Sequence, residues 1–213
     1  VTAIEGYTFN DCEDLENVTL PQNLTSIGEY AFFCCFSSDS ESKLASIDIP
    51  SSVTNIGKYA FSGCEHLGSV TNMNGVTTIG DDAFALCTAL KEITIPQQVE
   101  KIGAEAFMAC VQLKKIDIES DSNLTTVGER AFETTRYYAN GQLIEDLSGL
   151  GIETKIYCGA PLKKSGKLSN KGVAEENIIA SVTVKLVDGE KTETKTVAYG
   201  EPFGPLEKPT KEG

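Results

Sequence analysis

Phenylalanine returns at nearly constant intervals through the first 135 residues of the chain, with spacings of 23, 29, 23, 23 and 25 residues. An Ile or Val stands five residues before each Phe. In five of the six copies that residue is followed by Gly, the Phe is preceded by Ala, and a Cys comes three residues after the Phe. A repeat this short cannot bury its apolar side chains alone, so the pattern predicts a solenoid of stacked units. The six phenylalanines are Phe9, Phe32, Phe61, Phe84, Phe107 and Phe132.

Each repeat combines the patterns of two short strands and a turn. Residues 90–95 alternate apolar and polar side chains, which is typical of a strand with one buried face, and Pro96 ends that strand. A second extended piece follows at 99–102, and Gly103 leads into what we expect to be a single helical turn around Ala and Phe. Units stacked at about 4.8 Å per rung align Ile, Phe and Cys into buried ladders. We therefore expect a repeat solenoid, similar to leucine-rich repeats, with a parallel β-sheet on one face and short helical turns.

The repeat resembles the BspA-like leucine-rich repeats of bacterial surface proteins through the pattern Leu-x-x-Ile-x-Ile-Pro-x-x-Val-x-x-Ile-Gly-x-x-Ala-Phe-x-x-Cys. The resemblance covers residues 1–135 in six copies. It implies an extracellular or cell-surface location and a role in adhesion. The implied partner is a host or microbial protein or glycan, and the resemblance carries no catalytic residues to transfer.

The chain divides into three regions by pattern and composition. Residues 1–160 are expected to form the solenoid with its C-terminal cap, in which a strand at 152–157 covers the open end of the stack. Residues 161–177, rich in Lys, Ser and Gly, are expected to form a linker. Residues 178–213 predict a small β-rich module that begins with a hairpin turning at Asp188 and Gly189.

This last region resembles a Listeria–Bacteroides repeat through residues 196–202, which read Thr-Val-Ala-Tyr-Gly-Glu-Pro, together with Leu206 and Pro209. The resemblance implies an extracellular spacer of the kind that is often repeated in cell-surface proteins. The strand that follows in such repeats does not appear before Gly213, so we expect the module to be truncated.

Charge and hydropathy exclude several classes of partner. The formal net charge is −13, and the whole excess lies in residues 1–135, which hold 20 acidic and 7 basic side chains. This balance argues against binding nucleic acid or anionic membranes through charge. No apolar run approaches the roughly 18–20 residues that cross a bilayer, so we expect no membrane insertion. We expect a monomer.

Candidate catalytic and metal-binding residues are few. One Cys per repeat lacks the paired spacing of zinc sites, and free Cys is often buried. We therefore expect Cys64, Cys87 and Cys110 to be reduced, metal-free and shielded, and Cys34 to face a different way. A nucleophile pair of Cys64 with His66 is disfavoured because the thiol should point into the core. The acidic runs lack the spacing of an EF-hand. The sequence thus predicts no enzyme, no metal and no cofactor.

Together these features predict a non-enzymatic repeat protein that binds a macromolecule. Two alternatives stay open: a purely structural stalk that presents another domain, and an accessory region of a secreted hydrolase. If a partner binds, we expect it on the outward residues of the first strand in each repeat, because these form one continuous surface. This surface, the sheet face, consists of Thr19, Asp48, Thr71, Glu92, Thr94, Lys115 and Asp117.

Overall fold

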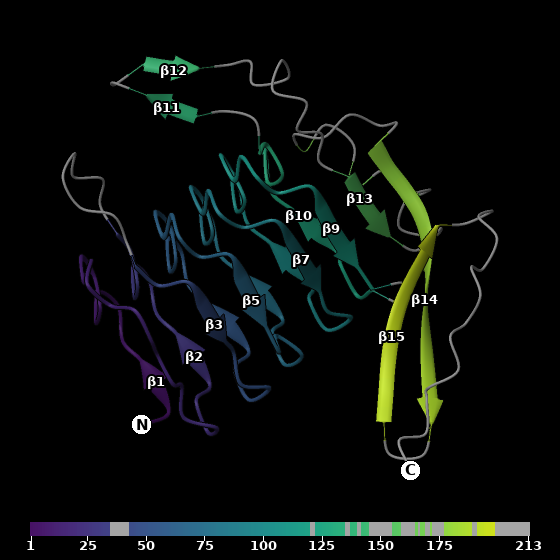
Figure 1. Ribbon diagram of the computed structural model, residues 1–213, viewed down its shortest axis with the longest axis horizontal. Helices are drawn as coiled ribbons and strands as arrows, with labels where there is room; N and C mark the ends of the chain where they lie inside the picture. The colour runs from purple at the N-terminus through teal and green to yellow at the C-terminus, as the bar shows by residue number, and fades with distance from the viewer. Residues whose placement is uncertain are drawn as a thin grey trace, which may run out of the picture.

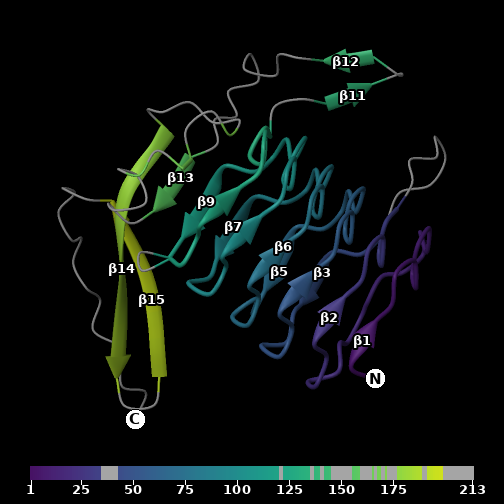
Figure 2. The same cartoon turned by 180° about the vertical axis from the view of Figure 1, so that it is seen from behind.

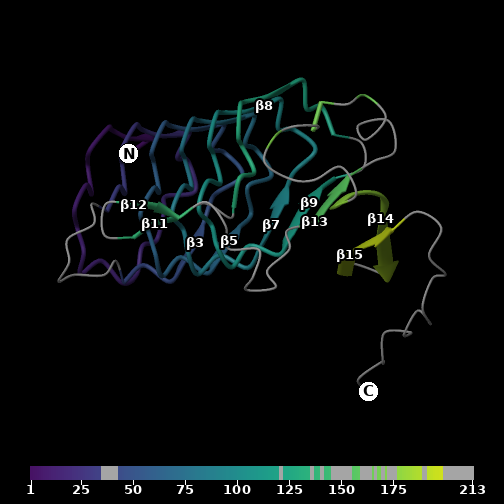
Figure 3. The same cartoon turned by 90° about the horizontal axis from the view of Figure 1, so that it is seen from above.

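In the computed structural model the repeats stand side by side in chain order, with the N-terminus at one end and a long hairpin at the other (Figure 1). Seen from above, the rungs are successive coils of one solenoid (Figure 3). Cys35 and residues 199–213, which carry part of the predicted C-terminal module, lie outside the described residues. The structure describes residues 1–34, 43–119, 122–134, 137–139, 142–144, 155–158, 165, 167–168, 171, 177–188 and 191–198.

The Val-x-x-Ile pieces form a six-stranded parallel sheet along one side of the stack. Each strand has two residues, and its second, apolar residue is buried. The strands pair in register, so that Ile27 lies between Ile4 and Ile56. The strands are β1 (Ala3–Ile4), β2 (Ser26–Ile27), β4 (Asn55–Ile56), β6 (Thr78–Ile79), β8 (Lys101–Ile102) and β10 (Thr126–Val127).

The Leu-x-x-Ile-x-Ile pieces form parallel strands on a second side. These are β3 (Ser46–Asp48), β5 (Ser69–Thr71), β7 (Glu92–Ile95) and β9 (Lys115–Ile118). The strand β3 pairs with β5, and β7 pairs with β9. Figure 2 shows the four strands following one another along the stack. The predicted parallel sheet is confirmed, but the solenoid carries a sheet on two sides and not on one.

The turn that joins the rungs differs from the expected helical turn, and no α-helix forms among the described residues. Two residues before the Phe of every described rung, the backbone has a positive φ, for example 53° at Asp82 and 55° at Glu105. A left-handed residue breaks the run of α-helical dihedrals. Two tight turns form around it: the N–H of Ala83 donates to the carbonyl of Gly80, and the N–H of Ala85 donates to that of Asp82.

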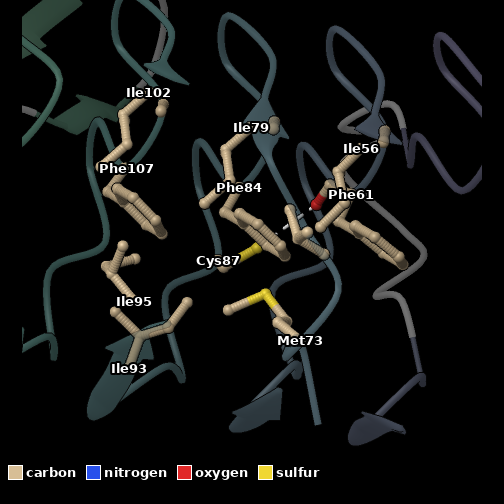
Figure 4. Close-up of a cluster of buried hydrophobic side chains, with 14 of the residues drawn as sticks. Ile56, Phe61, Met73, Ile79, Phe84, Cys87, Ile93, Ile95, Ile102 and Phe107 are labelled. Carbon is tan, nitrogen blue, oxygen red and sulfur yellow. Dashed lines mark hydrogen bonds between the residues drawn. The ribbon is translucent and has the colours of Figure 1, made fainter. Parts of the chain in front are cut away.

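A row of phenylalanine rings forms the centre of the core, as predicted. Phe61, Phe84 and Phe107 have no exposed surface, and their rings are stacked with centroids 5.3 and 5.5 Å apart. Figure 4 shows this row between the isoleucines of the first sheet and Ile93 and Ile95 of the second. Identical side chains stack because rungs in register place the same residue about 4.8 Å further along at every turn.

Glycine follows the buried Ile where successive backbones touch. A Cβ built on Gly80 lies 2.7 Å from the carbonyl carbon of Gly57 in the preceding rung, closer than real contacts allow. The N–H of Gly80 also donates to the carbonyl of Ile56 at 2.9 Å. The recurring Gly is therefore required by the close approach of two backbones.

The cysteines extend the buried ladder. Cys64, Cys87 and Cys110 are at most 1% exposed. The thiol of Cys87 donates to the carbonyl of Phe61, one rung earlier, at a distance of 3.3 Å. Cys34, expected to face a different way, is 8% exposed and belongs to the same apolar cluster. Cys12, in the first rung, is exposed.

The strand predicted at 152–157 covers the end of the stack. It forms β13 (Lys155–Cys158), which pairs in parallel with β9. The hairpin β14 (Ile178–Asp188) and β15 (Lys191–Ala198) continues the same sheet, as β14 pairs with β13. The predicted hairpin is confirmed, although Gly189 itself lies outside the described residues. A second hairpin consists of β11 (Tyr137–Ala139) and β12 (Gln142–Ile144).

Parts of the predicted linker contact the last rung. Leu168 is 1% exposed and belongs to the core. The backbone N–H of Phe132 donates to the carbonyl of Lys171 at 2.7 Å. Phe107 makes the equivalent bond to Ala131 of the next rung at 2.9 Å, so Lys171 takes the place that Ala occupies in the repeats. The division into residues 1–160, 161–177 and 178–213 stays a prediction.

Candidate binding surface

The strands β3, β5 and β7 bring much of the predicted sheet face together. Asp48, Thr71, Glu92 and Thr94 are exposed, because alternate residues of these strands point outward. Register places Asp48 opposite Thr71, whose hydroxyl donates to the Asp48 carboxylate at 2.7 Å. The side-chain amide of Asn72 donates to the same carboxylate oxygen. These contacts hold the Asp48 side chain in place on the surface.

The two ends of the sheet face differ from the expectation. Asp117 lies in β9 and is 9% exposed, because β13 pairs alongside with Tyr157 in register with Asp117. The ammonium group of Lys115 lies 3.4 Å from the Asp117 carboxylate. Thr19 is exposed but belongs to no strand of the described residues. The accessible sheet face is therefore the part formed by β3, β5 and β7.

A second surface, which the sequence analysis did not single out, lies along the turns. The residues with positive φ two positions before each Phe are Tyr7, Tyr30 and Tyr59 in the first three rungs. Their rings are stacked, with centroids 4.9 Å apart for Tyr7 and Tyr30 and 4.7 Å apart for Tyr30 and Tyr59. Phe33 packs edge-on against Tyr30 at 5.1 Å. We call these four residues the tyrosine edge. The sequence pattern that could have revealed this surface is a Tyr two residues before the Phe in three successive repeats.

The same row continues with charged residues in the last three rungs. Asp82 and Glu105 follow Tyr59, and the guanidinium group of Arg130 donates to Glu105 at 2.8 Å and to Glu133. Burial and the neighbouring Glu105 carboxylate raise the pKa of Asp82 to about 6. Burial and Asp82 raise the pKa of the Tyr59 hydroxyl to about 12. A partner cation beside Asp82 would relieve this concentration of negative charge.

The two members of the candidate nucleophile pair differ in burial. The thiol of Cys64 is buried and donates to the carbonyl of Phe32 at 3.1 Å, whereas His66 is exposed. Within the described ranges, no three His, Cys, Asp or Glu side chains gather as a metal site would require. In the same part of the chain no helix has the length and apolar character that crossing a bilayer requires.

Residues 1–40 and 39–151 match, in six copies, the family described as BspA type leucine rich repeat region. This match confirms the resemblance drawn from the repeat and extends past residue 135, where the expected region ended. It stops at residue 151, so the resemblance of the last residues to a Listeria–Bacteroides repeat stays a prediction. The chain has no significant match among curated proteins.

Three solved structures of leucine-rich repeat proteins are similar to the chain. A leucine-rich repeat protein from Bacteroides ovatus is 32% identical, with a TM-score of 0.55, over 63% of this chain and 33% of that protein. A T. pallidum leucine rich repeat protein is 27% identical over 53% of this chain and 49% of that one, with a TM-score of 0.47. A leucine rich cell surface protein from Faecalibacterium prausnitzii is 27% identical over 60% of this chain and 32% of that protein, with a TM-score of 0.42. The alignments thus span a third to a half of each relative's length.

Proposed function

The chain belongs to the family of BspA-type leucine-rich repeat proteins, and on this premise we propose that it is a non-enzymatic protein of the cell surface that binds a host or microbial protein or glycan. The proposal includes both the location and the adhesive role. Secretion and attachment to the surface are part of the same proposal, since repeats of this family are expected outside the cell.

The observation that supports binding most directly is the sheet face itself. Strands β3, β5 and β7 present exposed hydroxyls and carboxylates in rows, one strand per rung. Rungs about 4.8 Å apart make this surface long and shallow. Small molecules bind in concave, mostly apolar sites, so a shallow polar row suits an extended polymer or a protein surface better.

The chemistry of the sheet face sets the strength of the contact. Its exposed members are acids and hydroxyls, and none is aromatic. Aromatic and Arg side chains dominate the energetics of most interfaces, so the sheet face alone gives a weak contact. Exposed charges are screened within about 8–10 Å at physiological salt, and binding through Asp48 and Glu92 should therefore weaken as salt rises.

A binding screen of the whole chain tests the proposal. Immobilised collagen, fibronectin and fibrinogen and a glycan array serve as probes, and any ligand found is titrated by calorimetry. The double substitution Asp48→Ala and Glu92→Ala should lower the affinity for that ligand by about tenfold without unfolding the chain. The matched control, Glu100→Ala with Glu129→Ala, removes two exposed acids outside the sheet face and should bind normally.

One result would contradict the proposed binding function, and another would contradict only its assignment to the sheet face. If no probe binds, the chain acts as a stalk that spaces or presents another domain. If a ligand binds the Asp48 and Glu92 variant as tightly as the unchanged chain, the sheet face is the wrong surface.

A further inference from the structure

We propose that the tyrosine edge, formed by Tyr7, Tyr30, Phe33 and Tyr59, is a docking surface for a short polypeptide segment that carries basic side chains. This inference rests on the proposed binding function and assigns to it a surface separate from the sheet face. The edge combines exposed aromatic groups with carboxylates, which the sheet face does not.

Exposure and composition favour docking at this place. Tyr7 is 61% exposed, more than any other ring of the tyrosine edge. Tyr30, Phe33 and Tyr59 are partly exposed beside it. Tyr supplies a large contact area at low cost in side-chain entropy and is enriched where protein interfaces have their strongest contacts. Stacking within the row already fixes these rings, so less conformational entropy is lost when a partner binds.

The orientation of the rings favours a polypeptide over a sugar. Sugars bind aromatic side chains by stacking on a ring face. Both faces of Tyr30 are occupied, by Tyr7 at an interplanar angle of 11° and by Tyr59 at 21°. The ammonium group of Lys58 lies 5.1 Å from the centroid of the Tyr59 ring. At Tyr30 and Tyr59 the stack leaves ring edges and hydroxyl groups accessible, which aliphatic side chains and backbone amides contact readily.

The charges around the rings favour a basic segment. Burial and the neighbouring Tyr7 raise the pKa of the Tyr30 hydroxyl. Glu29 and Asp82 raise it too, whereas Lys58 lowers it. Asp82 and Glu105 likewise raise the pKa of the Tyr59 hydroxyl. Three carboxylates thus lie along the edge with the ammonium group of Lys58 and the guanidinium group of Arg130, which pairs with Glu105. The row from Tyr7 to Asp82 crosses four rungs, and the three steps between them add up to roughly 15 Å, which an extended segment of about five residues covers.

The test uses the full chain and a phage-displayed library of random peptides of about seven residues. We expect the selected peptides to combine Arg or Lys with aliphatic or aromatic residues. Synthetic copies of these peptides are then titrated by fluorescence anisotropy with two variants of the protein. One is the double variant Tyr30→Asn with Tyr59→Asn, and the other is Asp82→Asn. Asn is chosen for the tyrosine positions because it tolerates the positive φ of 55° found at both. Each variant should bind about tenfold more weakly or worse.

Two further variants keep the test decisive. Glu92→Gln is the matched control for Asp82→Asn, because each removes one carboxylate. Since Glu92 lies on the sheet face, Glu92→Gln should leave the affinity for the peptide unchanged. If the double tyrosine variant loses its cooperative thermal transition, Tyr7→Asn replaces it, because Tyr7 is the most exposed ring of the stack.

Each outcome decides the proposal. Failure to select peptides, selection of acidic peptides, or equal binding to the tyrosine variants overturns it. A glycan from the array that needs the tyrosines also overturns it, because the partner would then be a sugar. A ligand that depends on Asp48 and Glu92 but not on the tyrosines overturns this inference alone and leaves the proposed function standing.

Discussion

The thiol of Cys110 donates a hydrogen bond to the carbonyl oxygen of Phe84, one rung earlier, over 3.0 Å. The backbone N–H of Cys87 donates to the same oxygen at 3.3 Å, so this carbonyl links two rungs within the core. Cys64 and Cys87 make the same bond to Phe32 and Phe61. A small apolar side chain with one weak donor fits this position, and that is the physical reason for Cys64, Cys87 and Cys110 in the middle repeats.

These thiols should react slowly in the folded protein. Burial raises the pKa of the Cys110 thiol to about 12, and it also raises that of Cys87 well above its ordinary value. Since the thiolate is the reactive form, labelling at neutral pH needs unfolding. We expect peptide mapping after iodoacetamide treatment to show fast labelling of exposed Cys12 and slow labelling of Cys64, Cys87 and Cys110. Labelling of all four at one rate, or stoichiometric zinc in the purified protein, would contradict this.

Removal of a ring from the phenylalanine row should cost much of the stability. Phe84 has no exposed surface and stacks on Phe61 and Phe107, so Phe84→Ala opens a cavity inside a one-dimensional stack. We expect a loss of about 3–5 kcal/mol in the free energy of unfolding, measured with urea. Phe84→Leu serves as the control and should cost less, because Leu fills more of the cavity. An unchanged urea midpoint for Phe84→Ala would show that the row does not stabilise the fold.

The close approach of backbones can be tested with a pair of glycines. A Cβ on Gly80 meets the Gly57 backbone at 2.7 Å, whereas a Cβ on Gly68 has its nearest neighbour at 3.7 Å, an ordinary contact. Gly80→Ala should therefore destabilise the protein by about 2 kcal/mol or more, and Gly68→Ala should be nearly neutral. Thermal unfolding followed by circular dichroism compares the two. Equal melting temperatures would mean that the rungs can move apart at no cost.

The carboxyl group of Asp82 should make stability depend on pH. Burial and Glu105 raise its pKa to about 6, Asp81 acts in the same direction, and Lys58 and Tyr59 oppose them. The folded state then holds a proton between about pH 4 and pH 6 that the unfolded state has lost, so this group lowers the free energy of unfolding as pH rises through that window.

Asp82→Asn removes this dependence and should raise the free energy of unfolding at pH 7. Urea titrations of both proteins at pH 4, 5, 6 and 7 provide the measurement, and the exposed Glu92→Gln is the control. The difference between Asp82→Asn and the unchanged chain should grow with pH up to about pH 6 and then level off. A difference that is constant across the series would place the pKa of Asp82 outside this range.

The ladders could be predicted from the sequence because they depend on period alone. Once Phe, Ile and Cys recur at fixed offsets, stacking in register brings like residues together whatever the details of the turn. This rule predicted the buried positions of Phe61 and Phe84, and also those of Cys64 and Cys87. The strand β13 was predicted from its alternation at the point where the period ends.

The turn could not be predicted because its key position has no residue that signals it. The residues with positive φ include Tyr30, Asp82 and Arg130, none of which is the glycine that usually marks such a conformation. Bonds between rungs impose the conformation instead, since the N–H of Asp82 donates to Ala104 of the next rung. Asp117 was misjudged for a similar reason, because its burial comes from the pairing of β13, which lies far along the chain.

The bond from the Phe132 N–H to the Lys171 carbonyl has a consequence for how such proteins change over time. The Phe N–H of every rung donates to a carbonyl of the next rung, and the segment at Lys171 accepts the last of these bonds as another rung would. Duplication or loss of whole repeats in the middle of the gene therefore leaves both ends of the molecule chemically unchanged. The length of the solenoid can change in steps of one rung, while the surface residues of each rung diversify independently.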